Sequence, residues 1–224
     1  MTTTIFENVR AVLAEIPDEV DLLVAAKTRT AEEINQAISA GINIIGENYV
    51  QETETVCADI KCKVCWHFIG NLQKNKVRKA VQLFDMIETI DSFKLASIVS
   101  EACEKLGKIM PVLIEINSGE EQNKTGIMPS ETEKFIRKSA LLKGIKIEGL
   151  MTMGPLSDNP EEMRPYFRLT KGLFEHIKAC DIPNISMKYL SMGMSDSYKI
   201  ALEEGASIIR IGSAIFGQRS YDKN

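Results

Sequence analysis

Two cationic residues, Lys27 and Arg210, lie at apolar runs that are typical of buried strands. Lys27 directly follows the run DLLVAA, and Arg210 lies inside the run ASIIRIG near the other end of the chain. Because side chains alternate along a strand, Arg210 points away from the face that carries Ile209 and Ile211. That apolar face suits helix packing, so Arg210 is expected to face the interior, with Lys27 near it. Unpaired buried charges are costly, so an anion or a neutral lysine is expected there.

Glycine and serine turns follow the last two apolar runs. Gly193 and Ser195 lie in SMGMSD, and Gly212 and Ser213 lie in GSAIFG. Glycine lets a backbone approach closely, and Ser195 is predicted to cap a helix whose free N–H groups face a phosphate. A phosphorylated ligand beside Lys27 suggests Schiff-base chemistry, with either pyridoxal 5′-phosphate (PLP) or a phosphosugar. An alternative is that Arg210 forms only a structural ion pair, with Glu115 or Glu47.

The elements that must position these residues alternate along the chain. Apolar runs rich in Val and Ile predict eight strands, and polar-apolar segments between them predict helices. Strict alternation indicates a parallel sheet, and eight units indicate an α/β fold of the (β/α)₈ TIM-barrel type, with an additional N-terminal helix over residues 3–15. An open doubly wound sheet is the alternative, but no Gly-x-Gly-x-x-Gly turn is present. The predicted strands are 21–26, 42–46, 64–70, 83–88, 111–117, 146–151, 186–191 and 206–212.

Helix boundaries are indicated by capping residues. Thr30 and Ser130 are each followed three residues later by a glutamate, which predicts two capping boxes. Gly41, Gly107 and Gly205 each follow a predicted helix, where a left-handed residue is favoured. In a TIM barrel the active site lies at the carboxyl ends of the strands, which is where Lys27 and the two glycine-serine turns fall.

The composition of the chain argues against several classes of function. The 224 residues carry a formal net charge of −4 and are 44% hydrophobic, which predicts one globular domain over residues 1–224. A mildly acidic chain is a poor candidate for nucleic-acid binding, which needs excess Lys and Arg. No apolar run is long enough to span a membrane, and Glu7, Arg10 and Glu15 interrupt any signal-peptide core. We expect a cytoplasmic protein.

Three cysteines and a histidine cluster in the sequence at Cys57, Cys62, Cys65 and His67. A zinc site needs four converging ligands, and no second C-x-x-C or H-x-x-H is present. On an extended strand, Cys62 and Cys65 would face opposite sides. We therefore expect idle thiols and no metal.

Seven segments together resemble one known family, the pyridoxal phosphate homeostasis proteins, which are similar in fold to the N-terminal barrel domain of bacterial alanine racemase. They occur in the family's order from about residue 20 to residue 217. The segments are LLVAAKT, IGENYVQE, WHFIGNLQKNK, VLIEINSGEEQNKTG, GLMTMGP, YLSMGMSDSY and RIGSAIFG.

The resemblance implies PLP as cofactor and assigns the roles of its binding residues. Lys27 would carry the Schiff base, and Arg210 would face the pyridine nitrogen. The Met-Ser and Gly-Ser pairs would hold the phosphate, Asn48 would line the pocket, and His67 and Met151 would approach the ring. The implied cofactor-binding set is Lys27, Asn48, Met194, Ser195, Arg210, Gly212 and Ser213.

The resemblance also implies a function without efficient catalysis, namely a protein that stores, buffers or delivers PLP, with PLP-dependent apoenzymes as partners. An arginine stays protonated, so the ring nitrogen facing Arg210 must accept its hydrogen bond, and an unprotonated ring stabilises carbanions weakly. Racemases add a second base on the far face, associated with a further domain, but only residues 218–224 follow Gly217. We expect no such domain and a monomer. The alternatives are a small amino-acid racemase and a cofactor-free Schiff-base aldolase.

Overall fold

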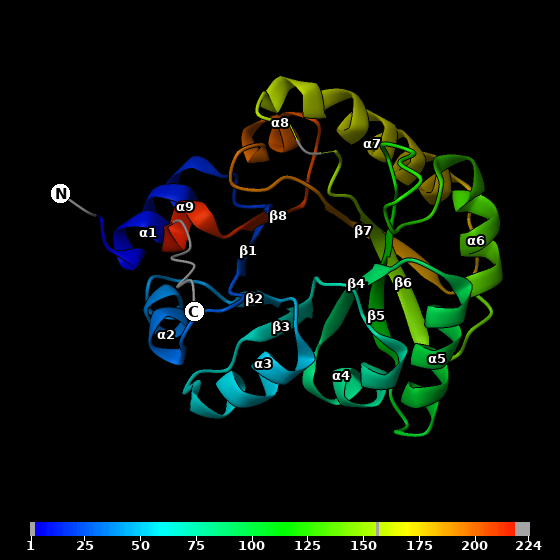
Figure 1. The fold of residues 1–224 in the computed structure, drawn as a ribbon. Helices are drawn as coiled ribbons and strands as arrows, with labels where there is room; N and C mark the ends of the chain where they lie inside the picture. The colour runs from blue at the N-terminus through cyan, green and yellow to red at the C-terminus, as the bar shows by residue number, and fades with distance from the viewer. Residues whose placement is uncertain (1–2, 156, 218–224) are drawn as a thin grey trace.

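Eight parallel strands pair in chain order and close into a barrel, because β8 pairs with β1 (Figure 1). The computed structural model describes residues 3–155 and 157–217. The strands are β1 (Asp21–Ala25), β2 (Ile44–Glu47), β3 (Cys65–Phe68), β4 (Met86–Ile90), β5 (Met110–Glu115), β6 (Ile145–Met151), β7 (Ile185–Ser191) and β8 (Ile208–Ile211). This confirms the predicted (β/α)₈ barrel and excludes the open sheet.

Helices surround the barrel and connect successive strands (Figure 1). The α-helices are α1 (Ile5–Glu15), α2 (Ala31–Ser39), α3 (Val50–Val56), α4 (Val77–Leu83), α5 (Phe93–Glu104), α6 (Thr132–Ser139), α7 (Arg164–Ala179), α8 (Tyr198–Glu203) and α9 (Ser213–Phe216). Four short 3₁₀ helices are η1 (Cys57–Asp59), η2 (Lys74–Lys76), η3 (Pro129–Glu131) and η4 (Pro160–Met163).

The additional N-terminal helix joins the two ends of the described chain. α1 lies beside α9, and the side-chain amide of Asn8 donates to the carbonyl oxygen of Ile215 at 2.8 Å (Figure 1). Val9 and Val12 bury the inner face of α1, as the helical spacing predicts. Residues 218–224, together with residues 1, 2 and 156, fall outside the described part, so the expectations of one domain over 1–224 and of no second domain extend beyond it.

Side-chain alternation sorts the core into an interior and an outer layer. Leu23 packs with Ile44 and Ile208 inside the barrel, while Leu22 and Val24 join the large cluster that includes residues of the helices. The same register pairs Leu23 with Arg210 across β1 and β8. The predicted inward direction of Arg210 is therefore confirmed.

Two local predictions are wrong. Ser130 does not cap α6; it lies inside η3, which Pro129 begins, and α6 starts at Thr132 without a side-chain cap. Proline fixes φ near the helical value, so the helical turn begins one residue before Ser130. The predicted strand 83–88 starts too early, because Leu83 ends α4 and β4 begins at Met86.

Other helix boundaries are confirmed. The side chain of Thr30 accepts from the backbone N–H of Glu33 at 3.2 Å and completes a capping box. Gly41, Gly107 and Gly205, which follow α2, α5 and α8, all have positive φ.

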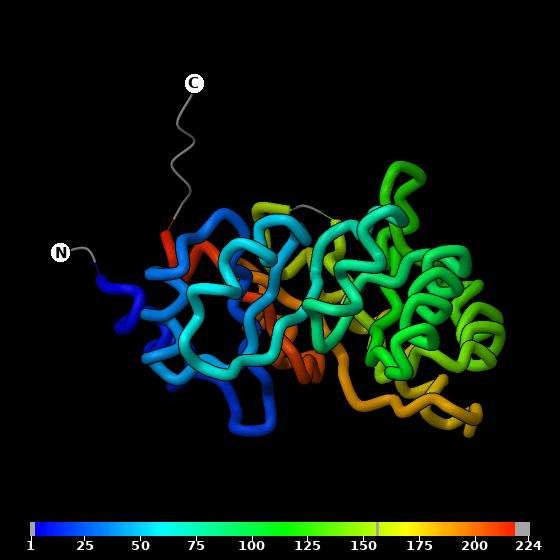
Figure 2. Tube along the Cα trace, turned by 90° about the horizontal axis from the view of Figure 1, so that it is seen from below, coloured from blue at the N-terminus to red at the C-terminus, as the bar shows by residue number. Residues whose placement is uncertain are grey.

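In the side view, the long loop between β5 and η3 and the short loop between α7 and β7 project in opposite directions (Figure 2). Within residues 3–155 and 157–217, no helix combines the length and apolarity needed to cross a bilayer.

Candidate functional site

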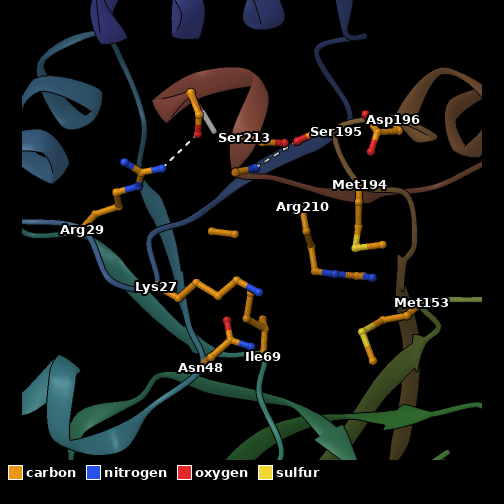
Figure 3. A pocket seen from close by; sticks show the side chains of 13 residues that line it. Lys27, Arg29, Asn48, Ile69, Met153, Met194, Ser195, Asp196, Arg210 and Ser213 are labelled. Carbon is orange, nitrogen blue, oxygen red and sulfur yellow. Dashed lines mark hydrogen bonds between the residues drawn. The ribbon is translucent and has the colours of Figure 1, made fainter. Parts of the chain in front are cut away.

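A cavity of about 240 Å³ opens at the carboxyl ends of β1 and β8 (Figure 3). All of the cofactor-binding residues predicted from the sequence line it, although they come from four separate parts of the chain. The lining residues are Ala25, Lys27, Arg29, Asn48, Ile69, Met153, Met194, Ser195, Asp196, Arg210, Gly212, Ser213 and Gly217. The structure thus gathers the predicted set in one place.

Lys27 enters the cavity from the turn that follows β1. The turn is tight, because the N–H of Arg29 donates to the carbonyl of Ala26 at 2.9 Å. Thr28 adopts φ 65°, a left-handed conformation that is strained for a β-branched residue, and its N–H is held by the carboxylate of Glu52 at 3.1 Å. The half-buried Lys27 side chain extends between Asn48 on one side and Ser213 on the other (Figure 3).

Arg210 is buried and held by a hydrogen-bond chain across the barrel interior. Its guanidinium donates to Ser191 Oγ at 2.6 Å and to the carbonyl of Thr152 at 2.9 Å. Ser191 donates in turn to Glu88 at 2.6 Å, and the other oxygen of Glu88 lies 2.7 Å from Nδ1 of His67. This chain fixes the guanidinium at the floor of the cavity.

The electrostatics of this hydrogen-bond network favour an ionised Glu88 and a protonated Arg210. Burial by itself raises the pKa of Glu88, but the hydrogen bond and charge of His67, the charge of Arg210 and the Ser191 hydroxyl outweigh it and hold the pKa below its usual value. Burial lowers the pKa of Arg210, which Glu88 and Glu115 counteract. An arginine remains protonated in proteins, so Arg210 is a permanent donor. Its main partner is Glu88 through Ser191, rather than the Glu115 or Glu47 considered from the sequence.

Ser195 links the loop after β7 to the loop after β8. Its hydroxyl accepts from the N–H groups of Gly212 and Ala214, both at 3.3 Å (Figure 3 draws Ser195 beside Ser213). The prediction that Ser195 caps the following helix is wrong. The N–H groups of Ser197 and Tyr198 both bond to the carbonyl of Met194, so the chain turns before α8 begins and Ser195 is directed toward β8 instead.

Glycine is required at Gly193, and a larger residue would be crowded at Gly212. Gly193 has φ 90°, and a Cβ there would lie 2.5 Å from the Cβ of Ala201. A Cβ on Gly212 would lie 3.3 Å from the carbonyl oxygen of Ala25 on the neighbouring strand. The backbone at the end of β8 therefore passes close to β1, and a branched side chain would push the two apart.

Asn48 and Glu47 bring polar groups without partners to the end of β2. Asn48 Oδ1 and Glu47 Oε2 are buried and have no hydrogen-bond partner among the described residues. Burial raises the pKa of Glu47 to about 8, and the nearby charge of Glu52 adds to the effect. At neutral pH, Glu47 is therefore mainly an uncharged acid, whereas Asn48 offers an unused acceptor to the cavity.

His67 and Met151 do not line the cavity, so the expected approach to the ring is not seen. His67 is committed to Glu88 in the interior, and Met151 is fully buried in a cluster with Met86 and Leu113. Sequence reasoning missed other lining residues. Barrel topology offered a signal for two of them, because Ile69 directly follows β3 and Met153 lies just beyond β6 (Figure 3).

The cysteine-rich segment contains free thiols. Cys62 precedes β3 and Cys65 begins it, so the premise that both lie on one extended strand is wrong. Both are exposed, and Cys57 is partly buried. Within the described residues, these cysteines and His67 do not form a group of three metal-ligating atoms.

Proteins with known names match nearly the whole chain. The pyridoxal phosphate homeostasis protein of Aquifex aeolicus is 38% identical over 201 residues, which cover 89% of this chain and 87% of that protein. The human protein of the same name is 38% identical over 218 residues, covering 90% of this chain and 78% of that protein. The chain belongs to the pyridoxal phosphate homeostasis protein family. This confirms the resemblance identified from the sequence.

The family's barrel is shared with alanine racemase. The family model described as "Alanine racemase, N-terminal domain" matches residues 2–220. The structure of PipY from Synechococcus elongatus with PLP bound has a TM-score of 0.88 at 30% identity and covers 96% of this chain and all of that one. An alanine racemase of Clostridium difficile, at 14% identity and a TM-score of 0.78, matches over 57% of its own length and shows the fold alone.

Proposed function

We propose that this chain binds PLP in the cavity at the carboxyl ends of β1 and β8 and acts as a reservoir for the cofactor. Two findings support the proposal. Relatives that are 34% to 38% identical are named pyridoxal phosphate homeostasis proteins, and PipY, at 30% identity, is described with PLP bound. The observation that carries it for this chain is that Lys27, Arg210, Ser195 and Gly212 line one cavity.

The lining residues fit the chemical groups of PLP. A primary amine, Lys27, suits the aldehyde, and the fixed donor Arg210 suits the ring nitrogen. Serine hydroxyls and close backbone at Gly212 suit the phosphate, where a Cβ would narrow the space. Asn48 supplies an acceptor that has no partner of its own in the described structure.

Each residue then has a defined task. The amine of Lys27 would hold the aldehyde of PLP covalently and reversibly, as a Schiff base formed with loss of one water. Arg210 would donate a hydrogen bond to the ring nitrogen, which would then be the acceptor and carry no proton. Glu88, through Ser191, balances the charge of Arg210 and holds its guanidinium at the floor of the cavity. PLP itself supplies the capacity to activate amino acids when a protein provides suitable bases.

The same geometry favours storage over turnover. Racemisation needs proton-accepting groups on both faces of a substrate carbon, and Lys27 supplies one. Among the described lining residues, Asp196 carries the one carboxylate, and it lies beside Ser195, where the phosphate is expected (Figure 3). We therefore place the chain with carriers rather than with racemases. Delivery to apoenzymes, a cytoplasmic location and a monomeric state stay predictions.

Absorbance and covalent trapping test this proposal. The purified chain, loaded with PLP, should absorb visible light, and borohydride should fix the pyridoxyl group on the peptide that contains Lys27. Lys27→Ala should not be labelled, while Lys188→Ala, a change on a half-exposed lysine of β7, should be labelled as the parent is. Label on another lysine of the parent would refute the site, and a chain that reacts with phosphosugars but not with PLP would restore the aldolase.

A further inference from the structure

Three side chains of the kinds that bind metals converge on the outside of the barrel, between α6 and α7. They are Glu133 of α6, His176 of α7 and Cys180 at the end of α7. Nε2 of His176 lies 2.8 Å from Glu133 Oε2 and 3.8 Å from the sulfur of Cys180. All three ligand atoms lie within 4.8 Å of one another, and they form the one such trio among the described residues.

Packing beneath the trio fixes its geometry. His176 and Cys180 are four residues apart, which puts them on the same face of α7, and Cys180 keeps helical backbone angles as the C-cap. Ile177, next to His176, and Ile136, one turn after Glu133, are both fully buried in the main core cluster. The two helices, neighbours in Figure 1, therefore present these three side chains from rigid backbone.

The spacing and the donor atoms suit a zinc ion. Zinc binds nitrogen, sulfur and oxygen at about 2.0–2.3 Å, so tetrahedral ligands lie roughly 3.3–3.7 Å apart. The distances from His176 Nε2 to Glu133 Oε2 and to the sulfur of Cys180, 2.8 and 3.8 Å, lie on either side of that range, so small side-chain rotations suffice. A mixture of imidazole, thiolate and carboxylate is a set that zinc accepts, with water in the fourth position.

The side chain of Arg137 would compete with a metal ion for Glu133. Nε of Arg137 donates to Glu133 Oε1 at 2.8 Å, and its pKa is raised by Glu133 and, to a smaller degree, by Cys180. The hydrogen bonds of His176 and Arg137 lower the pKa of Glu133, so this carboxylate is ionised at neutral pH. The Arg137 side chain is 50% exposed and can turn into solvent, which leaves Glu133 to a divalent ion.

We propose that Glu133, His176 and Cys180 form a zinc-binding site on the α6–α7 surface. The site is separate from the PLP cavity, which none of its residues line. The proposal revises the expectation, drawn from Cys57, Cys62 and Cys65, that the chain holds no metal. Zinc binding releases the thiol proton of Cys180 to solvent, since the thiolate is the ligand.

Cobalt is the probe that reports on the thiolate. The reduced full chain is titrated with Co²⁺, and difference spectra against the same protein without cobalt remove any absorbance of the PLP cavity. One equivalent should bind with a sulfur-to-cobalt charge-transfer band that Zn²⁺ abolishes. Cys180→Ser should remove the band, and His176→Ala should weaken binding at least about tenfold, the lower bound seen even for outer-shell changes. Arg137→Ala should strengthen binding, because it removes the competing cation.

The matched control is Cys62→Ser combined with Cys65→Ser, which removes two exposed thiols elsewhere. This control should keep the band. Retention of the band in Cys180→Ser, its loss in the control, or weaker binding in Arg137→Ala would each overturn the proposal. PLP labelling of Lys27 in the same variants reports on folding and on the cofactor site, so a failure of the zinc site is distinguishable from a failure of the proposed function.

Discussion

The guanidinium of Arg210 donates to the hydroxyl of Ser191 at 2.6 Å, at the floor of the cavity. Because the Ser191 hydroxyl donates its own hydrogen bond to Glu88, one small side chain connects a buried cation to a buried anion. Arg210 and Glu88 do not form a hydrogen bond with each other. Ser191 therefore restricts the orientation of the Arg210 guanidinium in the cavity.

Removing that hydroxyl tests this relationship. Ser191→Ala leaves both Glu88 and Arg210 with an unmet hydrogen bond in the interior, so the free energy of unfolding should fall by about 1–3 kcal/mol. PLP should also dissociate faster. Urea unfolding and cofactor release measure the two effects. Ser39→Ala, an exposed change on α2, should shift unfolding by no more than about 0.5 kcal/mol. Equal effects of the two substitutions would contradict the role of Ser191.

The phosphate end of the cavity gives a graded test. Ser213→Ala should weaken PLP binding by about 1–2 kcal/mol, the value of one hydrogen bond to a charged group. Gly212→Val should weaken it more, because the added side chain presses on the backbone of Ala25. Equilibrium dialysis with PLP measures both. If both variants bind PLP as the parent does, the phosphate lies elsewhere.

Glu47 should make stability fall with rising pH. Its folded pKa is about 8, above the usual 4.5, so the unfolded chain loses this proton first as the pH rises. This contribution to stability is fully present below about pH 4.5 and declines up to about pH 8, by at most about 1.4 kcal/mol per pH unit. Glu47→Gln cannot ionise. The variant should gain stability relative to the parent across this range in urea unfolding, and parallel pH profiles would show that Glu47 is already charged.

Turnover is the fourth test. Holoprotein incubated with a single enantiomer of alanine in deuterated water should show negligible inversion, because a missing general base costs roughly 10²–10⁴ in rate. Exchange of Lys27 for the amino group of alanine is still allowed. Mass spectrometry and chiral chromatography follow the two reactions. Rapid deuteration at the α-carbon together with inversion would restore the racemase alternative, and Asp196→Asn would then show whether Asp196 is the second base.

The barrel and the cavity could be predicted because the patterns that indicate them involve residues that are neighbours in the sequence. Alternation along β1 and β8 depends only on neighbouring residues, so the inward direction of Arg210 follows from Ile209 and Ile211. The glycine turns are similarly local. By contrast, the bond from Ser191 to Glu88 joins residues 103 positions apart, and no local pattern indicates it.

Errors arose where a short motif had two structural solutions. Ser195 has the residue type of a helix cap, yet the turn on Met194 directs its hydroxyl to Gly212 instead. Ser130 and Glu133 fit a capping box, but Pro129 starts the helical turn earlier. Glu133 is then free to contact His176, a pairing between two helices that spacing within one helix cannot show.

The pairing of β8 with β1, which closes the barrel, has a consequence for the newly made protein. Translation produces Lys27 before β8 and α9, which complete its cavity. A nascent chain shortened before residue 208 has an open sheet edge on β1 and lacks Arg210, Gly212 and Ser213. Under the proposed function, PLP binding requires β8 to be in place, so a chain truncated before residue 208 should bind PLP poorly.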